Sequence, residues 1–340
     1  MKYSQGVAAL ARRVVFRVAC VLFLGTTSHL LVAFDAAGQP ARTKPPFAVT
    51  HGSEIAAAIN IPKKDLKLEG ALFLPQKARR IRAVLVVMAN SETNALMLTG
   101  QNPYSVWHTA AESLSCALLH LRVSPIRAPE PGPNPNDPQR NAALGGADGL
   151  VALMHRFARE SRHPELVDAP FLFWGWSAQS AFGPSFALLH PERTVGFIRY
   201  HFGGLPNEVE RLKGIPALIF LAAQDNPEAV KLATTLFDQA RSLSAPWAMV
   251  VQPNAHHEIR APEIEAAGRL TMPWIDAVVN ARVRGSARLQ PLTNSDGWLG
   301  DHATGAISRA SEVESSHERR SWLPDERTAV AWQSLVAAAK

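Results

Sequence analysis

The sequence predicts an α/β protein with a doubly wound, mostly parallel central sheet and helices on both faces. From about residue 67 to residue 251, short apolar runs alternate with longer segments of helical spacing. Strands and helices in alternation require crossovers between parallel strands, which puts the sheet between two helical layers. Residues 81–88 form a continuous, largely β-branched run, which is typical of a strand covered on both faces. The composition, 47% hydrophobic and 19% charged over 340 residues, is that of an ordinary globular protein.

Each element has its own local signal. We expect strands wherever a short apolar run is bounded by turn residues, at residues 68–74, 81–88, 117–123, 170–174, 195–201, 215–222 and 247–251. We expect helices wherever apolar residues recur at helical spacing, at residues 106–114, 149–162, 178–189, 227–243 and 262–283. Residues 125–138 hold six prolines, which suit neither a helix interior nor a central strand. This stretch is predicted to be a surface loop, either one wall of a binding pocket or an inert excursion.

The first 38 residues are predicted to be a signal peptide. Four basic residues precede an almost wholly apolar run at residues 18–33, and that order is typical of a secretory signal. Polar residues at 26–29 interrupt the run, whereas a transmembrane helix needs about 20 consecutive apolar residues. We therefore expect cleavage and a periplasmic or secreted protein. The cleavage site, a twin-arginine route and an uncleaved membrane anchor are left open.

The rest of the chain is predicted to form one domain, residues 39–283, and a C-terminal extension, residues 284–340. In the extension, the Trp-Leu-Gly-Asp sequence at 298–301 is echoed by Trp-Leu-Pro-Asp at 322–325. Disordered tails are poor in aromatic residues, so we expect a loop strapped back onto the domain. The last segment has the start signals of a helix that packs on the domain. Its apolar face is formed by Ala329, Trp332, Leu335 and Val336.

The charge balance argues against a nucleic-acid partner. The chain has a formal charge of +6, from 35 Lys and Arg against 29 Asp and Glu. The first 38 residues hold four basic residues and one acidic residue, so half of the excess belongs to the predicted signal peptide. The remaining excess is dispersed, without the run of Lys and Arg that nucleic-acid binding needs.

The cysteine count excludes a disulfide framework and a cysteine-rich zinc module. The two cysteines, Cys20 and Cys116, allow at most one bridge. Cys20 leaves with the signal peptide if cleavage occurs. Cys116 lies in an apolar run and is expected to be a buried thiol without a partner.

The sharpest local signal surrounds Ser177. The apolar strand at 170–174 runs into Gly175-Trp176-Ser177 and straight out into a helix. This is the pattern of a strand-to-helix elbow, in which a tight turn exposes a serine hydroxyl at the top of a sheet. The turn needs small residues two positions before and two after the serine; Gly175 fits, whereas Gln179 stands where glycine is usual. A serine at an ordinary helix N-cap is the alternative interpretation.

Two further candidates follow the serine along the chain. Asp225 comes at the carboxyl end of the strand at 215–222, and His256 and His257 come a few residues after the last strand. In an open α/β sheet the site lies at the carboxyl ends of the strands, so these side chains are expected to meet. With the elbow and this chain order, the sequence resembles the α/β-hydrolase superfamily and, less specifically, secreted bacterial serine esterases.

The resemblance covers about residues 68–283 and implies a role for each candidate. Ser177 would be the nucleophile, a histidine would take its proton and later protonate the leaving group, and Asp225 would orient that histidine and stabilise its charge. His257 is preferred because the family usually has a glycine directly before the catalytic histidine, which aligns His256 with that glycine. His256 stays as the alternative base, and a turn residue stays as the alternative interpretation of Asp225.

An oxyanion hole needs preorganised donors. One would be the backbone N–H of Ala178, directly after the serine. In the family the other comes from the loop after the strand at 81–88, where a His-Gly pair is common and this chain has an alanine, Asn90 and Ser91. The resemblance implies the N–H of Ser91, with the side chain of Asn90 as the alternative donor.

These residues predict an exported serine hydrolase that acts on a carboxylic ester through an acyl-enzyme, with a small-molecule or polymer ester as its partner. The preference for an ester over an amide rests on the resemblance. No cofactor is implied, and no metal, because the sequence after His257 lacks the second histidine of a zinc-protease motif. A non-catalytic binding protein with the same fold, a peptidase and an acyltransferase are the alternatives. A membrane partner is expected only if residues 1–38 stay uncleaved, and the oligomeric state is open.

Overall fold

The computed structural model describes residues 52–88, 103–127, 137, 139–201, 208–285, 288–313 and 319–337. These ranges lie in one compact unit, residues 42–340. The predicted signal peptide, Asn90, Ser91 and most of the proline-rich stretch lie outside the described residues. None of the helices in these ranges combines the length and the apolar character that crossing a membrane requires.

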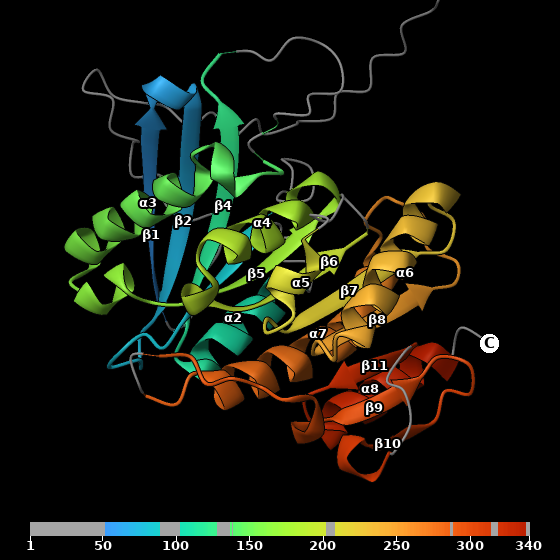
Figure 1. Cartoon of the computed structure of the whole chain (residues 1–340). Helices are drawn as coiled ribbons and strands as arrows, with labels where there is room; N and C mark the ends of the chain where they lie inside the picture. Colours follow the sequence, from blue (N-terminus) through green and yellow to red (C-terminus); the bar gives the residue numbers. More distant parts are fainter. Residues whose placement is uncertain are drawn as a thin grey trace, which may run out of the picture. The chain divides into compact units, whose positions relative to one another are not determined.

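An eight-stranded sheet forms the centre of this unit and confirms the predicted fold class (Figure 1). Its strand order is β1-β2-β4-β3-β5-β6-β7-β8. β2 pairs antiparallel with both β1 and β4, and the strands from β4 through β3 and β5 to β8 pair parallel. The strands are β1 (Gly52–Ile61), β2 (Leu66–Pro75), β3 (Val84–Met88), β4 (Ala117–Pro125), β5 (Phe171–Trp176), β6 (Thr194–Tyr200), β7 (Ala217–Ala222) and β8 (Trp247–Gln252).

Helices cover both faces of the sheet. A strand sends alternate side chains to opposite faces, so each strand contributes to two separate cores. In β5, Phe171 and Phe173 join one core, whereas Leu172 and Trp174 join the other. The first core takes side chains from α3, α4, α5 and α6, and the second takes them from α2, α7 and α8. The helices are α2 (Pro103–Leu114), α3 (Gly146–Ser161), α4 (Phe182–Leu189), α5 (Val209–Leu212), α6 (Pro227–Ser242), α7 (Ala261–Arg282) and α8 (Glu326–Ala337).

The N-terminal strand β1 is an element that the sequence pattern did not reveal. It forms an antiparallel hairpin with β2, yet Ala57 is its one buried residue. An edge strand of this kind has little apolar periodicity and so gives a weak strand signal. Several boundaries also differ from prediction. β3 covers Val84–Met88 instead of 81–88, β5 continues to Trp176 instead of 174, and a 3-10 segment at Ser177–Ala181 precedes α4.

The expectation of a loop in the C-terminal extension is wrong, because this part of the chain forms a three-stranded antiparallel sheet, β10-β9-β11. Its strands are β9 (Trp298–Asp301), β10 (Ile307–Arg309) and β11 (Arg320–Leu323). The two echoed Trp-Leu pairs lie on adjacent strands, with Trp322 opposite Leu299. A Cβ added to Gly300 would lie 2.5 Å from the ring of Trp332, so the glycine lets α8 pack against β9. Strands this short show no clear period in the sequence.

Cys116 is a buried free thiol, as the sequence predicts. Its Sγ lies 3.6 Å from the carbonyl oxygen of Leu114, to which the thiol donates. Burial raises the pKa of this thiol to about 12, so Cys116 stays protonated and is a structural residue.

Candidate active site

A left-handed turn at the end of β5 holds Ser177. Its φ of +53° costs a non-glycine residue about 1–3 kcal/mol. The Ser177 N–H donates to the carbonyl oxygen of His201 at 3.1 Å, and Ser180 Oγ donates to the Ser177 carbonyl oxygen at 2.6 Å. A Cβ added to Gly175 would lie 2.6 Å from the carbonyl oxygen of Gln179. The turn therefore requires the glycine that the elbow pattern places there.

Ser177, His257 and Asp225 form a continuous hydrogen-bonded chain. Ser177 Oγ lies 2.7 Å from His257 Nε2, and His257 Nδ1 lies 2.7 Å from Asp225 Oδ2. Because a carboxylate only accepts, Nδ1 carries the proton and Nε2 accepts from the serine hydroxyl. The side chain of Asp225 is 12% exposed and that of His257 is 38% exposed. This arrangement can remove the serine proton during an attack on a bound electrophile.

Three parallel strands deliver these side chains to one edge of the sheet. β5 ends directly before Ser177, and Asp225 and His257 follow β7 and β8. Asp225 also has the turn role that the sequence left open, because its Oδ1 accepts from the N–H of Asn226 at 2.7 Å. Asn226 in turn caps the start of α6. One carboxylate serves both the histidine and the turn, since it has two oxygens.

The structure brings His257, rather than its neighbour His256, to the serine. His256 is exposed to solvent. The ring of Trp176 lies beside His257, with centroids 5.8 Å apart, and Trp176 Nε1 donates to the His257 carbonyl oxygen at 2.9 Å. His257 is therefore held through its backbone as well as through its ring.

One of the two predicted oxyanion donors lies in the described residues. Ala178 follows the serine in the 3-10 segment after β5. The first N–H groups of a helical segment have no acceptor within that segment, so the Ala178 N–H can serve an oxyanion formed at Ser177. Ser91 and its alternative, Asn90, lie outside the described residues.

Gln179, which departs from the elbow pattern, has a contact of its own. Its Nε2 donates to Gln139 Oε1 at 2.7 Å. α4 packs closest to β5 at Gly183 and not at residue 179: a Cβ added to Gly183 would lie 2.7 Å from the Cβ of Phe173. The elbow therefore accommodates a long side chain at residue 179.

His201 was not singled out in the sequence, yet it contacts the backbone of both the serine and the histidine. It follows β6, which lies between β5 and β7. It is fully buried, with Nδ1 2.9 Å from the carbonyl oxygen of His257 and Nε2 3.2 Å from Gln252 Oε1. Burial lowers the pKa of His201. The signal that could have revealed it is a histidine at the carboxyl end of a central parallel strand.

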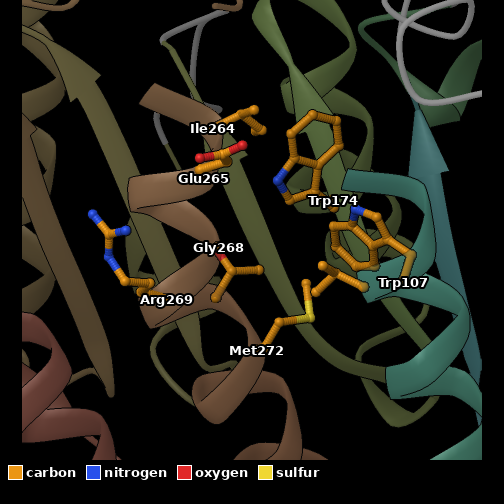
Figure 2. Close-up of a pocket in the computed structure, with 9 residues that line it drawn as sticks. Trp107, Trp174, Ile264, Glu265, Gly268, Arg269 and Met272 are labelled. Atoms are coloured by element: carbon orange, nitrogen blue, oxygen red, sulfur yellow. The ribbon is translucent and has the colours of Figure 1, made fainter. Parts of the chain in front are cut away.

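A cavity of about 350 Å³ opens between α2 and α7. Figure 2 shows its two tryptophans facing the residues of α7. The lining residues include Trp107, Trp174, Ile264, Gly268 and Met272, together with the charged Glu265 and Arg269. A Cβ added to Gly268 would have no heavy atom within 4 Å, so the glycine leaves this space open. Trp174 and Trp176 pack against the same core, and Trp176 contacts His257. Trp174 lines the cavity from β5, the strand that ends directly before Ser177.

The described ranges contain no group of three or more His, Cys, Asp or Glu side chains arranged to hold a metal ion. Both ring nitrogens of His257 are engaged, one by the serine and one by the aspartate. The site around Ser177 therefore offers nucleophilic and acid–base chemistry from its side chains.

No family model and no curated protein matches the sequence. Among solved structures, a thermostable esterase is similar, with 19% identity and a TM-score of 0.44. The match covers 58% of this chain and 54% of the esterase, so this chain spans about half of the esterase's length. An S-formylglutathione hydrolase from Agrobacterium tumefaciens is 12% identical, with a TM-score of 0.46 over 68% of this chain and 95% of that chain. An α/β serine hydrolase homologue from Coxiella burnetii is 13% identical, with a TM-score of 0.40 over 66% of this chain and 96% of that chain.

Proposed function

We propose that this chain, which has the α/β-hydrolase fold, is a serine hydrolase that cleaves carboxylic esters through an acyl-enzyme. The observation that carries this function is the pair of 2.7 Å contacts that link Ser177 Oγ to His257 and His257 to Asp225. The left-handed backbone at Ser177 supports it, because such strain is concentrated at functional sites. The unbroken hydrogen-bonded chain also favours catalysis over a non-catalytic protein of the same fold.

The proposed reaction follows from the donors and acceptors around the serine. The Ser177 hydroxyl gives its proton to His257 Nε2 as its oxygen attacks the ester carbonyl carbon, and Asp225 stabilises the imidazolium. The Ala178 N–H donates to the oxyanion that forms. His257 then protonates the leaving alkoxide as the ester C–O bond breaks, and the acyl group stays on Ser177. Water gives a proton to His257, attacks the acyl carbon and releases the acid, while Ser177 recovers its proton from His257.

Hydrolysis of p-nitrophenyl acetate tests this function. We expect turnover by the wild type and a loss of about 10⁴-fold or more in Ser177→Ala and in His257→Ala. A fluorophosphonate probe is expected to label the wild type and not Ser177→Ala. His256→Ala is the matched control and is expected to keep wild-type turnover, because His256 is exposed.

Wild-type turnover and labelling no greater than in Ser177→Ala would refute the serine hydrolase. Faster cleavage of peptides than of esters would reassign the enzyme as a peptidase. Transfer of the acyl group to an alcohol in preference to water would reassign it as an acyltransferase.

We infer that the cavity between α2 and α7 takes an apolar acyl group of the ester, because it is lined by Trp174 of β5, the strand that ends directly before Ser177. Gly268→Phe places a ring in the space that the glycine leaves open, and Gly268→Ala is its control. We expect Gly268→Phe to lower kcat/KM for p-nitrophenyl hexanoate about tenfold or more, since each buried methylene contributes about 0.8 kcal/mol. Hydrolysis of p-nitrophenyl acetate is expected to stay at the wild-type rate. Equal losses for both esters would show that the acyl chain binds elsewhere.

Export is the second part of the proposed function. It is supported by the basic residues and the apolar run within residues 1–38. Expression in a bacterial host, followed by fractionation and N-terminal sequencing, tests it. We expect the protein in the periplasm or the medium, with a new N-terminus at His29 or Gln39. Full-length protein confined to the cytoplasm would contradict export.

A further inference from the structure

We propose that His201 is a positioning residue that sets the distance between the serine and the histidine of the site. This role rests on the proposed hydrolase function. His201 contacts Ser177 through its backbone and His257 through its ring, so one residue links the two groups between which a proton must pass.

The backbone link holds the serine turn. The carbonyl oxygen of His201 accepts from the Ser177 N–H at 3.1 Å, and the His201 N–H donates to the carbonyl oxygen of Phe220 on β7 at 3.0 Å. His201 has φ of +48°, so its own backbone is left-handed, like that of the serine. These two backbone hydrogen bonds link the turn at Ser177, through His201 after β6, to Phe220 on β7.

The ring link holds the histidine. His201 Nδ1 lies 2.9 Å from the carbonyl oxygen of His257, to which Trp176 Nε1 also donates at 2.9 Å. A carbonyl oxygen only accepts, so His201 Nδ1 carries a proton. The His257 backbone is therefore fixed by two buried or half-buried donors, while its ring lies between the serine and the aspartate.

The environment of His201 locks its ring. The residue is 0% exposed, and its ring is stacked on that of Tyr200 with centroids 4.1 Å apart. On the other side, Nε2 faces Gln252 Oε1 at 3.2 Å, and Gln252 Nε2 donates to the carbonyl oxygen of Glu263 at 3.0 Å. The neutral ring with a proton on Nδ1 and the imidazolium both supply the donor that His257 needs, and only the imidazolium also donates from Nε2 to Gln252 Oε1.

Small displacements are costly at such a site. A misplacement of about 1 Å can cost about 100-fold in rate, because nucleophile and base must approach in one geometry. Without the ring of His201, the backbone of His257 keeps one of its two side-chain donors. We therefore expect loss of the ring to lower kcat and to leave KM unchanged, since His201 is buried away from substrate.

Two variants isolate the ring. His201→Gly removes it and adopts the left-handed backbone freely. His201→Asn also tolerates that backbone, and its amide nitrogen lies as many bonds from Cα as Nδ1 does, so it can donate to His257. We expect His201→Gly to lower kcat about 10- to 100-fold at constant KM, and His201→Asn to recover most of the loss. Equal kcat values for wild type and His201→Gly, or equal losses in both variants, would overturn the role.

A double-mutant cycle with Trp176→Phe covers the case in which His201→Gly does not fold. Trp176→Phe keeps an aromatic ring and removes the other donor to the His257 carbonyl oxygen. Combined with His201→Ala, whose side chain has no donor, it is expected to lose more than the product of the two single losses, because both donors then disappear. Strictly multiplicative losses would show that the two side chains do not share this task.

A readout independent of turnover separates this inference from the hydrolase function. The proton between His257 Nδ1 and Asp225 is expected to give a far-downfield proton NMR signal in the wild type and in His201→Asn. We expect that signal to be lost or shifted in His201→Gly. An inactive wild type in which the signal still responds to His201 would refute the hydrolase and retain the positioning role. An active wild type whose signal and kcat are indifferent to His201→Gly would overturn the positioning role alone.

Discussion

The middle and the carboxyl end of β8 are held in different ways. β8 is the last strand in the order of the sheet, and β11 and α8 of the C-terminal extension contact its middle. Ser321 Oγ accepts from the N–H of Met249 at 2.9 Å and donates to the Met249 carbonyl oxygen at 3.2 Å, and Trp332 Nε1 donates to the same oxygen at 2.8 Å. At the carboxyl end the chain leaves the sheet and places His257 against the serine and the aspartate.

The contacts at the middle of β8 stabilise the fold, whereas the chain that follows its carboxyl end carries a residue of the candidate site. Ser321 and Trp332 are fully buried, and they satisfy backbone groups at a strand edge that would otherwise be open to pairing with another chain. His257 is 38% exposed, and its hydrogen bonds join groups that suit proton transfer. We expect changes at the carboxyl end to alter kcat, and changes at the middle to alter the free energy of unfolding.

Asp225→Asn is expected to have the largest effect. Asparagine keeps the shape of the side chain but favours the wrong tautomer of His257, and in Ser-His-Asp triads this change lowers kcat by about 10⁴-fold. Steady-state hydrolysis and urea unfolding measure the two effects, and the free energy of unfolding is expected to change far less than the rate. Glu228→Gln, at an exposed position in the first turn of α6, is the control and is expected to keep full activity. A loss of kcat below about tenfold in Asp225→Asn would contradict the assigned role.

Trp332→Ala is the matching change at the middle of β8. Loss of a fully buried tryptophan is expected to lower the free energy of unfolding by about 3–5 kcal/mol, while kcat per folded molecule stays at the wild-type value. Urea unfolding and hydrolysis of the same samples provide the comparison. Trp332→Phe keeps most of the apolar area and loses the bond to Met249, so a smaller loss is expected. Comparable drops in kcat and in stability would erase the distinction between the two regions.

Ser321→Ala tests the edge contact alone. The N–H of Met249 is left without its acceptor, which is expected to lower the free energy of unfolding by about 1–3 kcal/mol. Ser334→Ala, at an exposed position of α8, is the matched control, and its effect is expected to stay within about 0.5 kcal/mol. If both variants unfold at the same urea concentration, the edge contact does not stabilise the sheet.

His302 lies in the C-terminal extension next to Ser321, and its burial is expected to make the free energy of unfolding depend on pH. Burial lowers the pKa of His302 to about 4, against about 6.5 in an unfolded chain. As the pH falls from about 6.5 to about 4, the unfolded state takes up a proton on His302 that the folded state does not. The free energy of unfolding is therefore expected to be lower at pH 5 than above pH 6.5, by about 1–2 kcal/mol.

Urea unfolding at pH 7.5 and pH 5 measures this loss. His302→Gln is expected to reduce it, and the amide nitrogen can still donate to Ser321 Oγ, as His302 Nε2 does at 3.0 Å. Some pH dependence is expected to persist, because burial also lowers the pKa of His120 to about 3. His155→Gln, at an exposed position, is the control. An identical pH dependence in His302→Gln and wild type would assign the acid sensitivity to other groups.

Much of the sheet and of the candidate site could be predicted because the determining patterns are local. Apolar runs bounded by turn residues marked seven of the eight strands of the main sheet, and β1 was missed because it buries little. The turn at Ser177 has its own signature in Gly175, whose added Cβ would collide with the following segment. Parallel strands then bring Asp225 and a histidine to the same edge. The choice of His257 over His256 rested on a family pattern and not on local chemistry.

The sequence by itself determined the layered fold, the elbow and the chain order of the three site residues, since each depends on periodicity or on neighbours a few positions apart. Only the tertiary structure decided how β9, β10 and β11 pair, how Gln179 fits the elbow, and that the ring of His201 meets the backbone of His257. Those contacts join residues far apart in the chain, 56 positions in the case of His201 and His257. Short strands and single buried hydrogen bonds leave no periodic trace, because they form only when packing elsewhere has already brought their partners together.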